Sequence, residues 1–155
     1  MRTQKEILES YEKYYEMIWR ICLVQFGNSH DAYDGTQETF VRLMNYNKSF
    51  RSEEHEKAWL IRVAVNYCKD VMKSSRRKNE ICLESGEPLE NGIVPEEYAE
   101  VYETMMELPG EYRVILYLYY YEGYLLKEIA EMLKINDSTL RSRFAKAKEL
   151  MKEYL

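Results

Sequence analysis

The stretch LLKEIAEMLKINDSTLRSRFAKAKELMK, residues 125–152, decides the fold of the C-terminal part of the chain. Apolar residues recur in it at spacings of three and four, which is typical of amphipathic helices. One short helix and the turn behind it would be packed by Ile129, Ala130, Leu133 and Ile135. Asn136 or Asp137 could then cap a second helix. The pattern predicts two helices joined by a tight turn, a helix-turn-helix.

The second of these helices has a narrow apolar stripe and a polar outer surface. The stripe consists of Leu140, Phe144, Ala147 and Met151. Outside it lie hydroxyl and basic residues, namely Ser138, Thr139, Arg141, Ser142, Arg143, Lys146 and Lys148. A DNA recognition helix has this form, because its first side chains enter the major groove while basic residues bind phosphates. A solvated basic helix in a bundle is the alternative, but the small Ala130 and the capped start favour the helix-turn-helix.

Two more helices are predicted at the other end of the chain. The first has a stripe of Ile7, Tyr11, Tyr14, Ile18 and Cys22, and it should end at Gly27 or Asn28. The second should span residues 32–44, with the apolar stripe Tyr33, Phe40 and Met44 and the start signal NSHD before it. Residues 46–56 lose this periodicity and are predicted to form a loop.

A long helix with two different faces is predicted from residue 58 onward. Its apolar face carries Ala58, Ile61, Val65, Cys68 and Met72, so Cys68 is interpreted as a packing residue. The neighbouring face carries polar and basic residues, namely Arg62, Asn66, Lys69, Lys73 and Arg76, and continues into Arg77 and Lys78. Such a helix offers one face to a core and a basic face to an anionic partner.

The charge distribution separates two basic segments by an acidic one. The net charge of the chain is −5, but residues 79–112 hold ten glutamates and no Lys, Arg or Asp, so the rest carries +5. Residues 79–95 contain Gly and Pro without apolar periodicity and are predicted to form a flexible linker. Helices should follow from near Glu96 and from Pro109. We therefore predict an all-α protein of two small helical domains, 1–78 and 96–155, joined by the acidic linker 79–95.

Several classes of protein are disfavoured by the composition. Cys22, Cys68 and Cys82 are odd in number and widely spaced, which argues against a disulfide framework or a zinc site. With only two histidines no catalytic triad can be proposed, so we expect a non-enzyme with no cofactor, metal or small-molecule substrate. The longest apolar run, residues 114–121, is far shorter than the ~20 residues of a membrane span. The charged N-terminus has no signal-peptide pattern, and a cytoplasmic location is expected.

Over almost its full length the sequence resembles the extracytoplasmic-function sigma factors, small members of the sigma-70 family. DAYDGTQETFVRL, residues 31–43, is similar to a segment of sigma region 2, and AWLIRVAVNYCKDVMKSSRRK, residues 58–78, to the segment that closes that region. LPGEYRVILYLYYYEGYLLKEIAEMLKINDSTLRSRFAKAKELM, residues 108–151, is similar to region 4. The resemblance implies a protein that binds core RNA polymerase and directs it to promoters, with the two domains being regions 2 and 4.

The resemblance also implies site residues. Contact with the clamp helices of the largest polymerase subunit falls to Asp31, Asp34, Gln37, Glu38 and Arg42, whereas Phe40 should be mostly core. The loop that captures a base flipped out at the minus-ten element corresponds to Asn47, Lys48, Ser49, Phe50 and Arg51. Nearby duplex and single strand would lie along Arg62, Asn66, Lys69, Lys73, Arg76 and Arg77. Region 4 would read the minus-thirty-five element and contact the flap of the second-largest subunit, and an anti-sigma factor is an expected further partner.

Three positions depart from the family pattern. Gly35-Thr36 replaces an apolar pair and should weaken its helix slightly. Lys134 stands where a turn glycine is common, so the turn should be strained or altered. Ala145-Lys146 replaces a common His-Arg pair. Two other functions remain open from the sequence: a stand-alone helix-turn-helix regulator, which leaves the N-terminal half unexplained, and a sigma-like protein-protein adaptor.

Overall fold

The computed structural model describes residues 2–78 and 99–154, without the side chains at 75–78, 99, 101 and 154. These two stretches are built from α-helices and turns and contain no strand, which confirms the all-α prediction. The chain divides into two compact units, Met1–Glu87 and Pro88–Leu155. The predicted linker, residues 79–95, lies outside the described residues.

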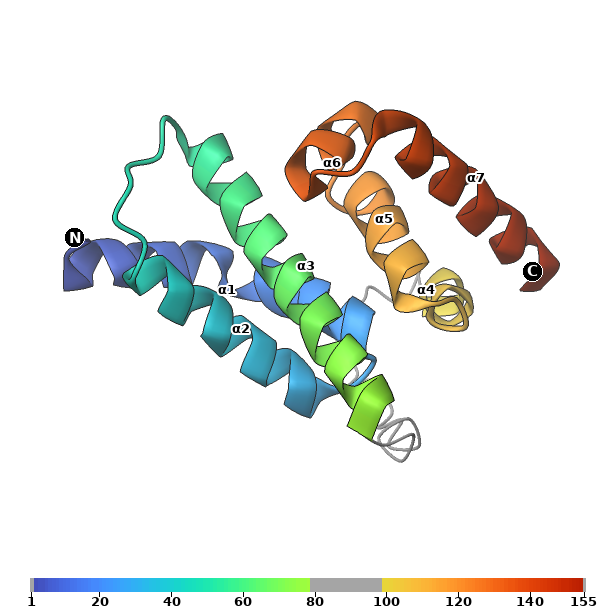
Figure 1. Ribbon diagram of the computed structural model, residues 1–155, viewed down its shortest axis with the longest axis horizontal. Coiled ribbons are helices and arrows are strands. Elements are labelled where there is room, and N and C mark those ends of the chain that lie inside the picture. The colour runs from blue at the N-terminus through green and yellow to red at the C-terminus, as the bar shows by residue number, and fades with distance from the viewer. Residues whose placement is uncertain (1, 79–98, 155) are drawn as a thin grey trace. The chain divides into compact units, whose positions relative to one another are not determined.

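Three helices form the N-terminal unit, α1 (Gln4–Phe26), α2 (Ser29–Met44) and α3 (Glu53–Lys78), and each packs against the other two (Figure 1). The turn between α1 and α2 follows from two residues. Gly27 ends α1 in the left-handed conformation, with φ of 80°. Asn28 then caps α2, because its side chain accepts a hydrogen bond from the Asp31 amide. The predicted end of the first helix is confirmed, and α2 begins three residues earlier than predicted.

The predicted apolar stripe of α2 is only partly right. Phe40 is buried as expected, but Tyr33 is 53% exposed and Met44 is 49% exposed. The buried face of α2 is instead made mostly of small residues, together with Phe40 and Leu43: Ala32, Gly35, Thr36 and Thr39. The two threonine hydroxyls are satisfied within the helix, since they donate to the carbonyls of Ala32 and Gly35. Small side chains give no apolar signal in the sequence, and this explains the error.

The long third helix is confirmed, and it begins at Glu53, inside the stretch predicted to be a loop. The Ser52 hydroxyl accepts a hydrogen bond from the His55 amide at this start. The buried face contains the predicted Ile61, Val65 and Cys68, and also Leu60 and Ala64. Cys68 is fully buried beside Cys22, and both are free thiols. A hydrogen bond with Cys22, together with burial, raises the pKa of the Cys68 thiol far above its ordinary value, so it is a packing residue.

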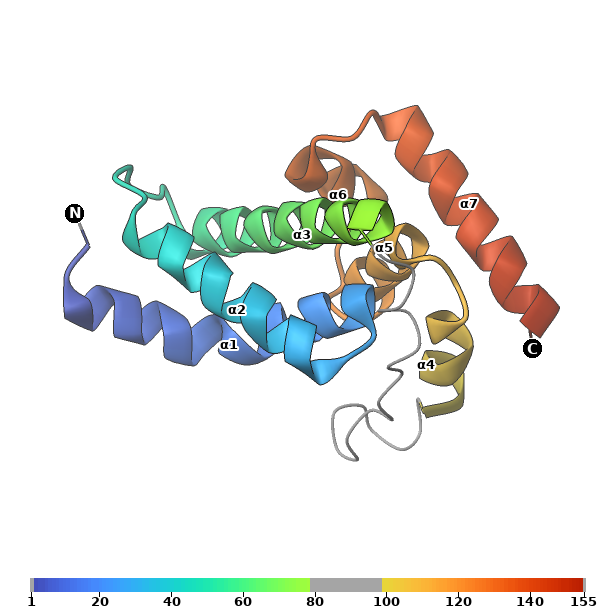
Figure 2. The same ribbon diagram turned by 60° about the horizontal axis from the view of Figure 1, so that its bottom comes forward.

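Four helices form the C-terminal unit: α4 (Ala99–Met106), α5 (Gly110–Tyr120), α6 (Leu126–Leu133) and α7 (Asp137–Tyr154). Figure 2 shows the short turn between α6 and α7, and α7 also packs on α4 and α5. Pro109 is the N-cap residue of α5, so the helix begins at Gly110, one position later than predicted. The fully buried centre of the unit includes Ile115, Leu118, Ile129 and Leu140.

The turn from α6 to α7 is a helix-turn-helix turn with an unusual residue. Lys134 adopts the left-handed conformation, with φ of 55°, and it is the one non-glycine residue with positive φ in the described part of the chain. The Ile135 amide then donates to the Ala130 carbonyl at 3.0 Å. Asn136 is the cap of the next helix, since its Oδ1 accepts from the Ser138 amide at 2.9 Å. Of the strained or altered turn expected at Lys134, the structure has the strained form, because a non-glycine residue has positive φ. Ile135, which was expected to pack the turn, is only half-buried.

Candidate nucleic-acid and protein interfaces

A pocket of about 410 Å³ lies between the start of the chain and the loop that joins α2 to α3. Loop residues Asn47, Lys48, Ser49 and Phe50 line it, which are four of the five residues predicted to receive a flipped base. Arg51, the fifth, is exposed and is not part of the lining, and its amide donates to His55 Nδ1 at 3.0 Å. Three carboxylates, those of Glu6, Glu53 and Glu56, also line the pocket. Its walls therefore combine amide, hydroxyl, aromatic and charged groups that can hydrogen-bond and stack with a base.

Aromatic rings hold the loop against α3. Tyr46 stacks on Phe50 with ring centroids 5.4 Å apart, and it also lies 4.6 Å from the Trp59 ring. Phe50 contacts the His55 ring edge-on at 5.3 Å. These contacts hold Phe50, which lines the pocket, in place. Tyr46 and Trp59 were not among the predicted site residues, although aromatic residues at the two ends of an aperiodic stretch are a signal in the sequence.

Arg2 reaches the same loop from the beginning of the chain. One terminal guanidinium nitrogen donates to the Lys48 carbonyl at 2.8 Å, and the other donates to the Tyr46 carbonyl. The guanidinium carbon lies 4.6 Å from the centre of the Phe50 ring and 5.5 Å from that of Tyr46. This residue was not among the predicted site residues, since no local pattern marks it.

The predicted basic face of α3 lies beside the buried face of that helix. Asn66 and Lys73 are exposed, and Arg62 and Lys69 are half-buried. Their spacing of three and four residues places them in one row along the helix. The side chains of Arg76 and Arg77, predicted to extend this row, lie outside the described residues.

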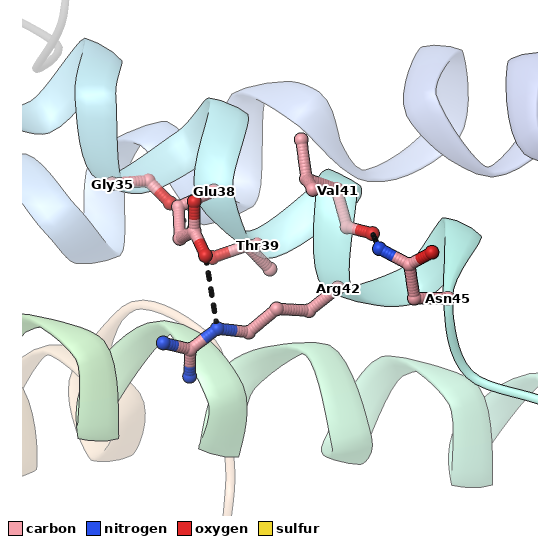
Figure 3. Close-up of polar contacts among 6 residues, drawn as sticks. All are labelled: Gly35, Glu38, Thr39, Val41, Arg42 and Asn45. Carbon is pink, nitrogen blue, oxygen red and sulfur yellow. Dashed lines mark hydrogen bonds and ion pairs between the residues drawn. The ribbon is translucent and has the colours of Figure 1, made fainter.

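The outer side of α2 carries a row of charged residues, Asp34, Glu38 and Arg42, all of them predicted polymerase contacts. Because two of the three are carboxylates, it is called the acidic row. Figure 3 shows the Arg42 side chain extending back to Glu38, one turn earlier, with 3.3 Å between Nε and Oε1. Arg42 also lies over the Tyr67 ring of α3. Burial, followed by the nearby carboxylates of Glu38 and Asp34, raises the pKa of Tyr67. The acidic row therefore borders α3 and remains open to a partner.

A second row on α2 is apolar and borders α1. It consists of Tyr33, Gln37, Val41 and Met44, in which Gln37 donates to the Tyr11 hydroxyl at 3.0 Å. Tyr33, Val41 and Met44 are all among the exposed large hydrophobic residues. Exposed apolar residues gathered next to charged ones are typical of a protein-binding surface. Tyr33 and Met44 were predicted to lie in the core, so this row was not predicted.

One predicted contact residue also has a structural role. Asp31 accepts a hydrogen bond from the Asn28 side chain at 2.9 Å, within the cap of α2. Asp31, His30 and Asp34 form the one group of possible metal ligands in residues 2–78 and 99–154. Asp31 also takes part in the cap of α2, and His30 Nε2 lies 3.8 Å from Asp34 Oδ2.

The outer surface of α7 carries the residues predicted for a recognition helix. Six of the seven are exposed, namely Ser138, Thr139, Arg141, Ser142, Lys146 and Lys148, and Arg143 is half-buried. Arg141 Nε is paired with Asp137 Oδ2 at 3.0 Å, one turn earlier. A pocket of about 500 Å³ between α6 and α7 adds Lys127 and Lys134 to the neighbourhood of Arg141. These two lysines were not predicted, because they lie on the helix and turn that precede the recognition helix.

Comparisons with known proteins find a match to each of the two units. Two family models match the chain, Sigma-70 region 2 over residues 10–78 and Sigma-70, region 4 over residues 98–151. The ECF RNA polymerase sigma factor SigW of Bacillus subtilis is 26% identical over 92% of this chain and 84% of that protein. The ECF RNA polymerase sigma factor SigM of the same organism is 29% identical over 93% of this chain and 91% of that protein.

A solved structure shares the fold. It is the sigma factor RpoE in complex with the anti-sigma factor NepR from Bartonella quintana, with a TM-score of 0.73 and 19% identity over 97% of this chain and 96% of that chain. In the described part of the present chain, no helix is long and apolar enough to cross a membrane.

Proposed function

Because the chain belongs to the extracytoplasmic-function group of the sigma-70 family of RNA polymerase sigma factors, we propose that its two units act on different promoter elements. As a member of that family it binds core RNA polymerase and promoter DNA, and it directs transcription initiation. Residues 1–78 form the unit that contacts the polymerase clamp and opens the minus-ten element. Residues 96–155 form the unit that reads the minus-thirty-five element, and residues 79–95 connect them.

The pocket beside Phe50 is the observation that carries the proposal for the N-terminal unit. A base leaves a duplex only at a cost of a few kcal/mol in stacking and pairing, so a protein that melts DNA must return this energy through a pocket. The aromatic surface of Phe50 and the polar groups of Asn47 and Ser49 are suited to do so. Arg62, Asn66, Lys69 and Lys73 would hold the adjoining strands, since Lys and Arg bind phosphates and Asn can pair with a base edge.

The two rows on α2 are the proposed contact with the clamp helices of the largest polymerase subunit. The acidic row supplies Asp34 and Glu38 together with Arg42, and the apolar row supplies Tyr33, Val41 and Met44 around Gln37. An interface of this composition combines apolar burial with charges that set its orientation. Asp31 would contribute from the edge, where its carboxylate also caps the helix.

The surface of α7 is the proposed reader of the minus-thirty-five element. Ser138, Thr139 and Arg141 lie in its first turns, the part of a recognition helix that reaches base edges. Ser142, Arg143, Lys146 and Lys148 follow toward the flanking phosphates. We expect the same unit to contact the flap of the second-largest subunit.

Further partners and location follow from the family and belong to the proposal. Sigma factors are not an enzyme class, and we assign no catalytic residue, cofactor or small-molecule substrate to this chain. RpoE of Bartonella quintana is bound by an anti-sigma factor, and a regulator of that kind is expected for this chain. A protein that works with RNA polymerase is expected in the cytoplasm.

Run-off transcription with purified core polymerase tests the proposal. Core enzyme with the chain should produce transcripts that depend on a promoter selected by that holoenzyme, and core enzyme alone should not. A stand-alone regulator would bind DNA without supporting initiation, and an adaptor would bind polymerase without doing so. Either of those two results would contradict the proposed function.

A further inference from the structure

We propose that Arg2 is a positioning residue of the pocket, which holds the loop 46–50 in the conformation that receives an unpaired base. The inference rests on the proposed base-capturing function of that pocket. It begins from an unusual connection: the second residue of the chain bonds to two carbonyls that lie 44 and 46 positions later. Such contacts fix a loop relative to a helix from another part of the sequence.

The geometry of the contact accounts for the choice of arginine. The guanidinium group is a planar fork whose two terminal nitrogens can bond two acceptors at once, and here they bond the carbonyls of Tyr46 and Lys48. Its carbon lies 4.6 Å from the centre of the Phe50 ring, within the range of a cation–π contact. A lysine ammonium is a point charge on a flexible stem and cannot reproduce the planar fork.

Beside the ring contacts of Tyr46 and Phe50, backbone hydrogen bonds anchor the two ends of the loop. The Tyr46 amide bonds to the Leu43 carbonyl at the end of α2, and the Arg51 amide bonds to His55 near the start of α3. Arg2 acts on the stretch between these anchors, which includes residues that line the pocket. It therefore controls the stretch whose shape determines how well a base fits.

Arg2 also balances the charge of the pocket. The carboxylates of Glu6, Glu53 and Glu56 line the same cavity, and the lining cations are Arg2 and Lys48. Loss of Arg2 would leave a wall with three carboxylates and one ammonium group beside an anionic strand. Loss of this charge and loss of the ordered loop would both weaken binding of the strand. Arg2→Lys separates the two effects, because it keeps the positive charge and loses the planar fork.

The test uses holoenzyme and a forked promoter fragment that carries 2-aminopurine next to the unpaired minus-ten base. Capture of that base should unstack the probe and raise its fluorescence. Arg2→Ala should weaken binding of the forked fragment about tenfold, the loss expected for hydrogen bonds to a charged group, while fully duplex upstream DNA binds as before. Arg2→Lys should recover less than half of this loss on a logarithmic scale. Lys5→Ala, which removes an exposed cation from the first turn of α1, should match the wild type.

The outcomes separate the two proposals. If holoenzyme with the wild-type chain gives no fluorescence rise, the base-capturing function itself is wrong. If the wild type gives the rise and Arg2→Ala gives the same rise and affinity, the positioning role is wrong. Full recovery by Arg2→Lys would also overturn it, because charge alone would then suffice. Circular dichroism and thermal unfolding of each variant should match the wild type, and Arg2→Lys provides the comparison if Arg2→Ala is less stable.

Discussion

Gly35 of α2 packs directly on Cys22 of α1: a Cβ added to Gly35 would lie 3.0 Å from the Cys22 sulfur. That sulfur has little room to move, since Cys22 is fully buried and its thiol shares a hydrogen bond with the Cys68 thiol. The glycine that should weaken α2 therefore permits the close approach of α1 and α2. Its cost to the helix is about 1 kcal/mol relative to alanine.

Gly35→Ala should destabilise the N-terminal unit by about 1 kcal/mol. The gain in helix propensity is about 1 kcal/mol, but overpacking of a closely packed core costs typically 1–3 kcal/mol. Chemical denaturation of the purified chain measures the difference. Cys22→Ala combined with Gly35→Ala should be more stable than the sum of the two single changes, because the added methyl group then occupies the space of the sulfur. Additive effects would show that the two side chains are not in contact.

Lys134→Gly should stabilise the C-terminal unit by about 1 kcal/mol. Lys134 is held at φ 55° and ψ 46°, where a non-glycine residue is strained by ~1–2 kcal/mol and glycine is not. Lys134→Ala is the matched control, since it removes the same charge but keeps the strain. A rise in unfolding temperature with alanine equal to that with glycine would show that the charge, and not the backbone, is responsible.

Tyr102→Phe should reduce the loss of stability at alkaline pH. Burial raises the pKa of Tyr102 to about 12, above its ordinary value of 10.0. Below pH 10 the Tyr102 phenol is protonated in both the folded and the unfolded chain, and its contribution to stability is fully present. Between pH 10 and 12 the Tyr102 phenol ionises in the unfolded chain but not in the folded one. The free energy of unfolding therefore falls by up to ~3 kcal/mol.

The same substitution should leave stability at pH 7 unchanged or higher, since the Tyr102 hydroxyl has no hydrogen-bond partner among the described residues. Denaturation at pH 7, 10 and 12 gives both quantities. Tyr120→Phe, at an exposed position on α5, is the control and should follow the wild type. A Tyr102→Phe variant with the same pH dependence as the wild type would contradict the assignment.

Asp34→Ala combined with Glu38→Ala should weaken binding to core polymerase and leave the fold intact. Glu38 takes part in an exposed ion pair with Arg42, and Asp34 lies 3.8 Å from the exposed His30. Such exposed contacts contribute only about 0–1 kcal/mol to stability. Competition against a labelled sigma factor measures core affinity, and circular dichroism checks helical content. Glu9→Ala combined with Glu12→Ala removes the same charge from exposed positions on α1 and should have little effect. If the two double variants lost core affinity equally, the cause would be the change in net charge and not a contact made by Asp34 and Glu38.

Local signals in the sequence were sufficient for most of the fold. Gly27 with Asn28 marks the turn after α1, and a strained or altered turn was expected at Lys134, because such signals depend on residues within about four positions. The sequence could not indicate that Gly35 faces Cys22, or that Arg2 bonds to Lys48, since both contacts join residues far apart in the chain. Tyr33 shows a third limit: an aromatic residue in helical register was assigned to the core, but it lies on the surface.

The proposed division of labour assigns the two units to different promoter elements. Holoenzyme selection from a promoter library, paired with permanganate probing of melted thymines, tests it most directly. Arg141→Ala should cost ~1–3 kcal/mol at one upstream base pair and relax preference there, while melting at preferred promoters continues. Lys69→Ala combined with Lys73→Ala should leave upstream preference unchanged, lower the salt dependence of binding and reduce melting. If the lysine changes altered upstream preference, or Arg141→Ala affected melting alone, the two units would be assigned to the wrong elements.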